Sequence, residues 1–135
     1  MPACKNINRK SPIPDTPVGM ELVLLRDAPE LYSIGNYKIY TTPPYVYQYV
    51  GYGGILLFHD LEDQIVAFDY ACPYEAVDTI RVDSLGDGGL VGCRHCHSVY
   101  DISYGIGFPI KGPSSYGLRR YRVTQSGNTI RVTRK

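Results

Sequence analysis

The 135-residue sequence has no tryptophan, only two methionines and no apolar run near the roughly 20 residues that a membrane-spanning helix needs. It also lacks excess charge, because 14 Lys and Arg residues against 13 Asp and Glu residues leave a formal net charge of +1. Without a domain-wide basic field to attract phosphates, we expect no nucleic acid partner. No phosphate-binding loop or nucleophile motif occurs, so the sequence supplies no catalytic residue and an enzyme is not indicated.

Turn-forming residues and tyrosine are abundant instead, with 14 Gly, 10 Pro and 13 Tyr. Apolar residues alternate with other residues at a period of two, and no helical period is sustained for three turns. We therefore predict a single all-β domain of antiparallel sheets. The predicted strands are 18–24, 37–42, 45–50, 55–59, 64–70, 118–124 and 129–133, with hairpins at 55–70 and 118–133.

Residues 1–17 contain four of the ten prolines and almost no large apolar side chain, which predicts a flexible tail or linker. Cys4 follows the small residue Ala3 and precedes a polar stretch, as at the lipidation junction of bacterial lipoproteins. One interpretation is a lipid on Cys4, an upstream apolar signal and attachment to a membrane of the cell envelope, in the periplasm or on the outer surface. The other is an exposed thiol in a flexible tail.

Two surface features have competing interpretations. Tyr45, Tyr47 and Tyr49 alternate with other residues along one segment. This pattern fits a strand with a solvent-exposed edge, where Tyr buries its ring and keeps its hydroxyl in water, better than a stacking platform for bases or sugars. From Lys111 to Lys135 there are seven cations and no acid, while nine of the thirteen acids lie between Asp60 and Asp101. We interpret the basic stretch as a solvated strand face protected from edge pairing, with an anionic-lipid or docking patch as the alternative.

Three further cysteines lie in two loops, each of which we expect at the end of a strand. Cys72 follows strand 64–70, and Cys93 and Cys96 have C-x-x-C spacing with His97 next to them. Thiolates and imidazoles in such loops suit zinc, an iron–sulfur cluster or covalent haem. Cys72, Cys93, Cys96 and His97 are therefore the candidate metal and cofactor ligands.

Together with its flanking strands, this pattern resembles the Rieske iron–sulfur domain, which carries C-x-H in a first loop and C-x-x-H-G in a second. The resemblance runs from Ile55 to Val132 and includes Lys111-Gly112-Pro113, which is similar to the loop that covers the cluster. It implies a Rieske-like, sandwich- or barrel-like fold over residues 18–135, with a loop-rich subdomain at about 70–113. It also implies a 2Fe-2S electron-transfer module with a protein redox partner. With the tail after Cys4, the chain is most similar to Rieske-like lipoproteins of Bacteroidota.

Both histidine positions of the family pattern differ here. Tyr74 stands at the first and Cys96 at the second, while His97 falls on the family's glycine. Because the two histidines hold one iron of a Rieske cluster, we expect that this chain does not hold a standard cluster. The alternatives are a non-standard 2Fe-2S or zinc site, a c-type haem on Cys93, Cys96 and His97, and a metal-free envelope binding protein with buried thiols or one disulfide.

Overall fold

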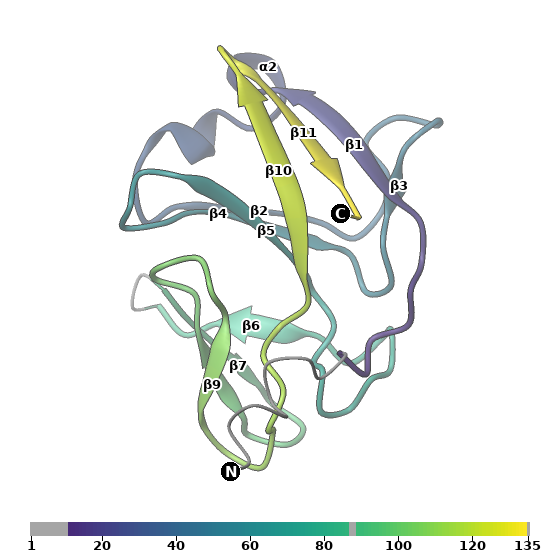
Figure 1. The fold of residues 1–135 in the computed structure, drawn as a ribbon, viewed down its shortest axis with the longest axis vertical. Coiled ribbons are helices and arrows are strands. Elements are labelled where there is room, and N and C mark those ends of the chain that lie inside the picture. The colour runs from purple at the N-terminus through teal and green to yellow at the C-terminus, as the bar shows by residue number, and fades with distance from the viewer. Residues whose placement is uncertain (1–10, 87–88, 135) are drawn as a thin grey trace, which may run out of the picture.

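The computed structural model describes residues 11–86 and 89–134, so Cys4 lies outside the described residues. A seven-stranded sheet has the order β2-β4-β5-β10-β11-β1-β3, and a four-stranded sheet with the order β6-β7-β8-β9 lies below it in Figure 1. The predicted all-β class is confirmed. The elements are β1 (Val18–Val23), α2 (Leu24–Asp27), η1 (Pro29–Tyr32), β2 (Tyr37–Tyr40), β3 (Tyr49–Val50), β4 (Ile55–His59), β5 (Ile65–Asp69), β6 (Val82–Ser84), β7 (Leu90–Cys93), β8 (Val99–Asp101), β9 (Phe108–Lys111), β10 (Arg120–Ser126) and β11 (Thr129–Thr133).

Both predicted hairpins are present, because β4 pairs with β5 and β10 pairs with β11, each pair antiparallel. The turn of the first hairpin is closed by Asp60, whose buried carboxylate accepts hydrogen bonds from the backbone N–H groups of Glu62 and Gln64. None of the described helices is long and apolar enough to cross a membrane.

The predicted strand at 45–50 is wrong over most of its length. Only Tyr49 and Val50 form a strand, and they pair with Gly19 and Val18 at the start of β1. Before them the chain turns, with the Gln48 N–H donating to the Tyr45 carbonyl, and the Val46 side chain is fully exposed. The alternation of tyrosines therefore lies on a surface loop, since none of the strands in the described part of the chain pairs with residues 45–48.

The segment from residue 11 to residue 17 packs on the domain. Ile13 is 2% exposed, and its carbonyl accepts a hydrogen bond from the Arg119 guanidinium. Asp15 forms an ion pair of 2.6 Å with the same guanidinium. This part of the expected tail is therefore held beside the start of β10.

Two apolar clusters form the core. The first fills the space within the large sheet and includes Leu22, Leu57 and Ile130. The second joins the large sheet to the small one, and in it Phe58 and Phe68 pack with Cys72, Cys93 and Tyr100. Two of the candidate ligands are therefore part of the packed interior.

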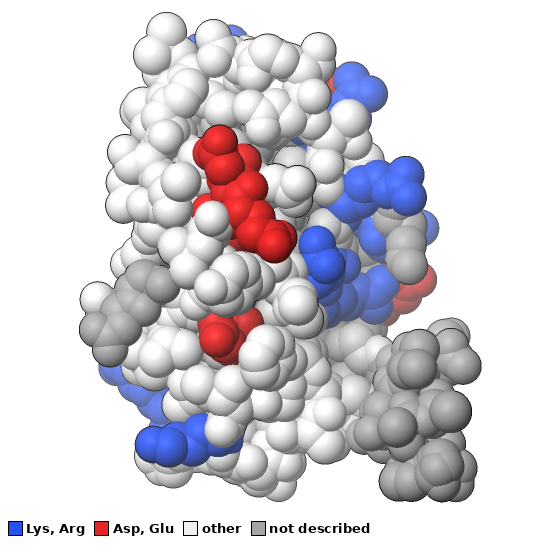
Figure 2. Space-filling model, turned by 60° about the vertical axis from the view of Figure 1, so that its left-hand side comes forward, with Lys and Arg blue, Asp and Glu red and all other residues white. Residues whose placement is uncertain are grey.

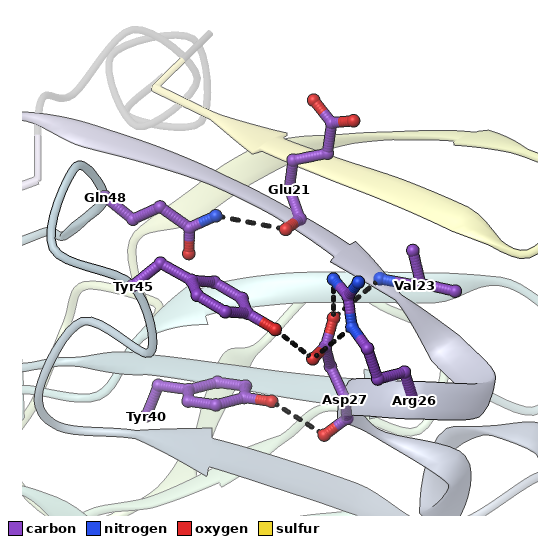
Figure 3. Close-up of polar contacts among 7 residues, drawn as sticks. All are labelled: Glu21, Val23, Arg26, Asp27, Tyr40, Tyr45 and Gln48. Carbon is purple, nitrogen blue, oxygen red and sulfur yellow. Dashed lines mark hydrogen bonds and ion pairs between the residues drawn. The ribbon is translucent and has the colours of Figure 1, made fainter.

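Asp27, the last residue of α2, fastens the tyrosine loop to the domain (Figure 3). Its carboxylate accepts hydrogen bonds from the Val23 N–H at 2.9 Å and the Tyr45 hydroxyl at 2.6 Å, and it pairs with Arg26 at 3.0 Å. The Tyr40 hydroxyl donates to the Asp27 backbone carbonyl. The Arg26 hydrogen bond, followed by those of Tyr45 and Val23, outweighs burial and lowers the pKa of Asp27 from 3.8 to about 2.

We expect Asp27→Asn to destabilise the fold at neutral pH by about 1–2 kcal/mol, because the ionised carboxylate serves as acceptor to all three groups. A lowered native pKa contributes stability that is fully present above about pH 4 and is lost as the pH falls towards about 2. Urea unfolding at several pH values should therefore show a shallower loss in acid for Asp27→Asn than for wild type. Glu62→Gln, at an exposed carboxyl, is the charge-matched control. Parallel acid profiles for wild type and Asp27→Asn would contradict this account.

Candidate functional site: a three-thiol centre

The first loop of the site begins where β5 ends. The Cys72 N–H donates to the Ile80 carbonyl at 2.9 Å, and the Cys72 carbonyl accepts from the Ala76 N–H at 2.9 Å, so a tight turn follows the cysteine. Cys72 is fully buried, whereas Tyr74, two residues later, is 51% exposed. The loop therefore leaves the interior only after Pro73, which is also buried.

A buried carboxylate, Asp69, holds the entry to this loop. It accepts four hydrogen bonds of 2.7–2.9 Å, from the N–H groups of Tyr52, Gly53 and Ala71 and from the hydroxyl of Tyr121. A Cβ atom on Gly53 would lie 2.6 Å from that of Ala71, so the backbone beside the loop leaves no space for a side chain. The position of Cys72 thus depends on contacts with two other parts of the chain.

The second loop connects β7 to β8. Cys93 ends β7, its N–H donates to the Ser98 carbonyl, and its carbonyl accepts from the His97 N–H. His97 has a φ of +65°, in the left-handed region that favours glycine. This backbone agrees with the position at which the family pattern has glycine.

A third segment, after β9, closes on the second loop. Gly112, with a φ of +91°, lies so close to Ser98 that a Cβ would approach the Ser98 Cα to 2.5 Å. The Ser114 N–H donates to the Ser98 hydroxyl at 3.1 Å, and that hydroxyl lies 3.3 Å from the Cys96 Sγ. The predicted Gly-Pro loop therefore reaches the cysteines through Ser98.

The three thiols converge. The Sγ atoms of Cys72, Cys93 and Cys96 all lie within 4.8 Å of one another, and those of Cys72 and Cys96 are 3.7 Å apart. Cys72 and Cys93 are buried, and Cys96 is partly buried. Sulfur atoms around one tetrahedral zinc ion lie about 3.8 Å apart, given a Zn–S bond of about 2.3 Å. The spacing therefore suits a single metal ion.

The surroundings distinguish the thiols. Burial, the largest cause, raises the pKa of Cys93 to about 12. Burial also acts on Cys96, but hydrogen bonds from Ser98 and from the other two thiols outweigh it and lower the pKa of Cys96. Burial, and then the contact of the Tyr100 hydroxyl with the Cys72 Sγ at 3.4 Å, raises the pKa of Tyr100. The surroundings therefore favour ionisation of Cys96 and oppose ionisation of Cys93.

The histidines lie outside this centre. His97 is exposed, and the exposed His95 pairs with Glu75 at 3.2 Å. Within residues 11–86 and 89–134, the grouping of possible metal ligands contains the three cysteines alone. The structure thus brings together three of the four predicted ligands and does not place His97 with them.

Two residues important to the site were not identified from the sequence. Ser98 and Asp69 are both fully buried, and each joins segments distant in the chain. Asp69 directly precedes Tyr70-Ala71-Cys72, but three of its four donors lie 16 to 52 residues away, so no local pattern signals its role.

No protein-family model and no curated protein matches the chain. Among solved structures, the complex of reduced oxygenase and oxidized ferredoxin in carbazole 1,9a-dioxygenase is similar at 14% identity and a TM-score of 0.55, over 87% of this chain and 94% of that one. The Sphingomonas yanoikuyae B1 ferredoxin is 14% identical with a TM-score of 0.53, over 78% and 94% of the two chains. The ferredoxin of carbazole 1,9a-dioxygenase from Nocardioides aromaticivorans IC177 is 20% identical with a TM-score of 0.50, over 89% and 99%.

These structures are Rieske-type ferredoxins, and the likeness confirms that this chain has a Rieske-like fold. At these identities the comparison bears on the fold alone. The assignment of ligands, the lipid and the bacterial group stay predictions.

We expect Tyr121→Phe to lower the free energy of unfolding by about 1.5–3 kcal/mol, because the Asp69 carboxylate loses one buried donor. Tyr49→Phe, at an exposed position, is the matched control and should change stability by less than about 0.5 kcal/mol. Guanidinium unfolding measures both. Equal stabilities for the two variants would show that Asp69 does not depend on the Tyr121 hydroxyl.

Proposed function

We propose that this chain is a Rieske-fold protein of the cell envelope that holds one thiophilic metal ion, of the zinc type, in place of a 2Fe-2S cluster. The observation that carries the proposal is the convergence of three Sγ atoms within 4.8 Å of one another. Cys72, Cys93 and Cys96 are the ligands, and the fourth position is left to a water molecule or an external ligand.

The donors do not fit a Rieske cluster. That cluster needs two cysteines on one iron and two neutral histidines on the other. Tyr74 and Cys96 stand where the family pattern has histidine, and the exposed His97 is not among the converging groups. In a 2Fe-2S cluster, the ligands of the second iron lie on the far side of two bridging sulfides. The third thiol lies so close to the other two that it is better placed to bind the same metal ion as they do.

Covalent haem fits less well. Attachment needs both thiols of the C-x-x-C pair to face one prosthetic group, but Cys93 is 3% exposed inside the second apolar cluster and the Cys96 Sγ lies beside Cys72. A metal ion without redox chemistry would make the chain a binding or interaction protein with an envelope partner, and not an electron carrier. Its metal would tie the two cysteine loops together.

A second candidate is a metal-free protein with a disulfide between Cys72 and Cys96, favoured by their Sγ separation of 3.7 Å. An oxidising envelope would support it, with each thiol losing one proton and one electron to a disulfide-type oxidant. Cys93 would then remain a buried thiol.

Metal analysis of protein purified without oxygen should find about one zinc per chain and no acid-labile sulfide. Thiol counting after chelation should find Cys72, Cys93 and Cys96 free. Iron with labile sulfide would overturn the proposal in favour of a cluster. A metal-free protein that lacks two of these thiols until it is reduced would replace the proposal with the disulfide candidate.

A gain-of-ligand variant sharpens this test. Tyr74→His combined with Cys96→His restores both histidine positions of the family pattern. After reconstitution with iron and sulfide, we expect the double variant to develop a Rieske-type visible and EPR spectrum, whereas wild type and the single variant Tyr74→His do not. A Rieske spectrum from wild type would contradict the single-ion site.

For the envelope location, we propose that Cys4 carries the lipid. Expressed from the full gene and washed with high salt, which screens electrostatic binding to the membrane, wild-type protein should sediment with membranes, and Cys4→Ser should move to the soluble fraction. Cys96→Ser, which also removes one thiol but at a partly buried position, is the control and should remain with the membranes. If Cys4→Ser fractionates like wild type, Cys4 is not the anchor.

A further inference from the structure

The basic closing hairpin is not used by the metal site. On the outer face of β10 and β11, Arg120, Arg122 and Arg131 are exposed, while Tyr121 and Val132 point into the core. The register places Arg122 opposite Thr133 and Arg131 opposite Thr124, so the arginines share one face with small polar residues. Figure 2 shows a group of Lys and Arg side chains at the right of the view, beside a stripe of Asp and Glu side chains.

Only part of this charge is neutralised. Arg131 pairs with Glu21 at 2.9 Å, and Asp15 lies 2.6 Å from Arg119 and 3.8 Å from Arg134. None of the acidic residues in the described chain forms an ion pair with Arg120 or Arg122. Five arginines with two acidic partners therefore leave a local excess of positive charge.

The unpaired arginines border a groove. Arg120, Arg122 and Arg134 line it together with Gln64, and its volume is about 360 Å³. One guanidinium group can donate two parallel hydrogen bonds to the oxygens of a phosphate. Several guanidinium groups on an exposed strand face therefore suit the phosphodiester groups of lipids. The groove thus offers a place for headgroups of anionic lipid.

The N-terminal segment leads to the same face. Ile13 and Asp15 are held by Arg119 just before β10, and Asp15 also lies 3.8 Å from Arg134 at the groove. Ser11 follows Cys4 by seven residues, a distance of at most about 25 Å when extended. A lipid on Cys4 would therefore bring the membrane within reach of the β10–β11 face.

We propose that the outer face of β10 and β11, with Arg120, Arg122 and Arg134 at its groove, docks on a membrane surface that contains anionic phospholipid. This inference rests on the proposed envelope location and adds to that location the face of the domain that contacts the lipid. Basic residues near an anionic surface add electrostatic attraction to the attachment that a lipid on Cys4 would supply.

The test uses the full chain with Cys4→Ser, so that binding does not depend on a lipid anchor. Co-sedimentation compares vesicles of three parts phosphatidylcholine to one part phosphatidylglycerol with vesicles of phosphatidylcholine alone. We expect binding to the anionic vesicles only. Each arginine near such a surface changes the partition coefficient by about fivefold, so Arg122→Gln should lower it about fivefold and Arg120→Gln with Arg122→Gln about 25-fold.

Lys38→Gln is the control, because it also removes one positive charge but lies on β2, an edge strand separated from β10 by β4 and β5. It should bind anionic vesicles within about twofold of the parent. Thermal unfolding checks that the exposed arginine variants remain folded.

Binding to neutral and anionic vesicles alike, or an equal loss for Lys38→Gln and Arg122→Gln, would overturn the proposal. Arginine-dependent binding of poly-glutamate without vesicle binding would assign the face to an acidic protein instead. Saturable binding of inorganic phosphate, without vesicle binding, would show that this face binds a free anion. Because the protein tested carries no lipid on Cys4, these outcomes are separate from the fractionation result that tests the anchor.

Discussion

The buried carboxylate of Asp69 is the interaction on which the cysteine loops depend. It joins the backbone of residues 52 and 53, the entry to the Cys72 loop and the β10 residue Tyr121 through four hydrogen bonds. A buried charge without partners would be very costly, so these four donors must be in place whenever the domain is folded. The Arg81 guanidinium adds a bond to the Gly53 carbonyl, which fixes the same loop from the side of the small sheet.

Where one face of a strand is buried, the sequence was a sufficient guide to the fold. Met20, Leu22, Ile130 and Val132 alternate with exposed residues, and their strands form as predicted. At residues 45–48 the same alternation misled, because tyrosines on a loop can be fastened by hydroxyl groups, as Tyr45 is by Asp27 (Figure 3). The short helix at Leu24–Asp27 also escaped prediction, since one turn is too short to establish a helical period.

The sequence predicted which cysteines form the candidate site, but it did not predict how the side chains around them are arranged. Two cysteine loops expected at strand ends indicated that Cys72, Cys93 and Cys96 would converge, and they do. Whether the His97 side chain lies beside the three thiols depends on the backbone φ angle of His97. In a left-handed conformation, at the position where the family has glycine, the residue continues the turn and its side chain remains exposed. No periodicity reports a single φ angle, so proximity in sequence suggested a ligand that the fold does not place there.

The second apolar cluster supports the shape of the cysteine loops independently of what the site binds. Cys72, Cys93 and Tyr100 pack there against Phe58 and Phe68, so these loop residues contribute to the core whatever the site binds. Tyr74 and Cys96, where the Rieske pattern has histidine, are more exposed than Cys72 and Cys93, so they contribute less to this packing. The hydrogen bonds of Ser98 to the Gly-Pro loop and of Asp69 to the Cys72 loop likewise require no metal. Packing and hydrogen bonds therefore determine the fold, whereas the side chains at the site determine what it binds. For this reason a similar fold does not identify the ligand of this centre, and its chemistry must be argued from the three thiols.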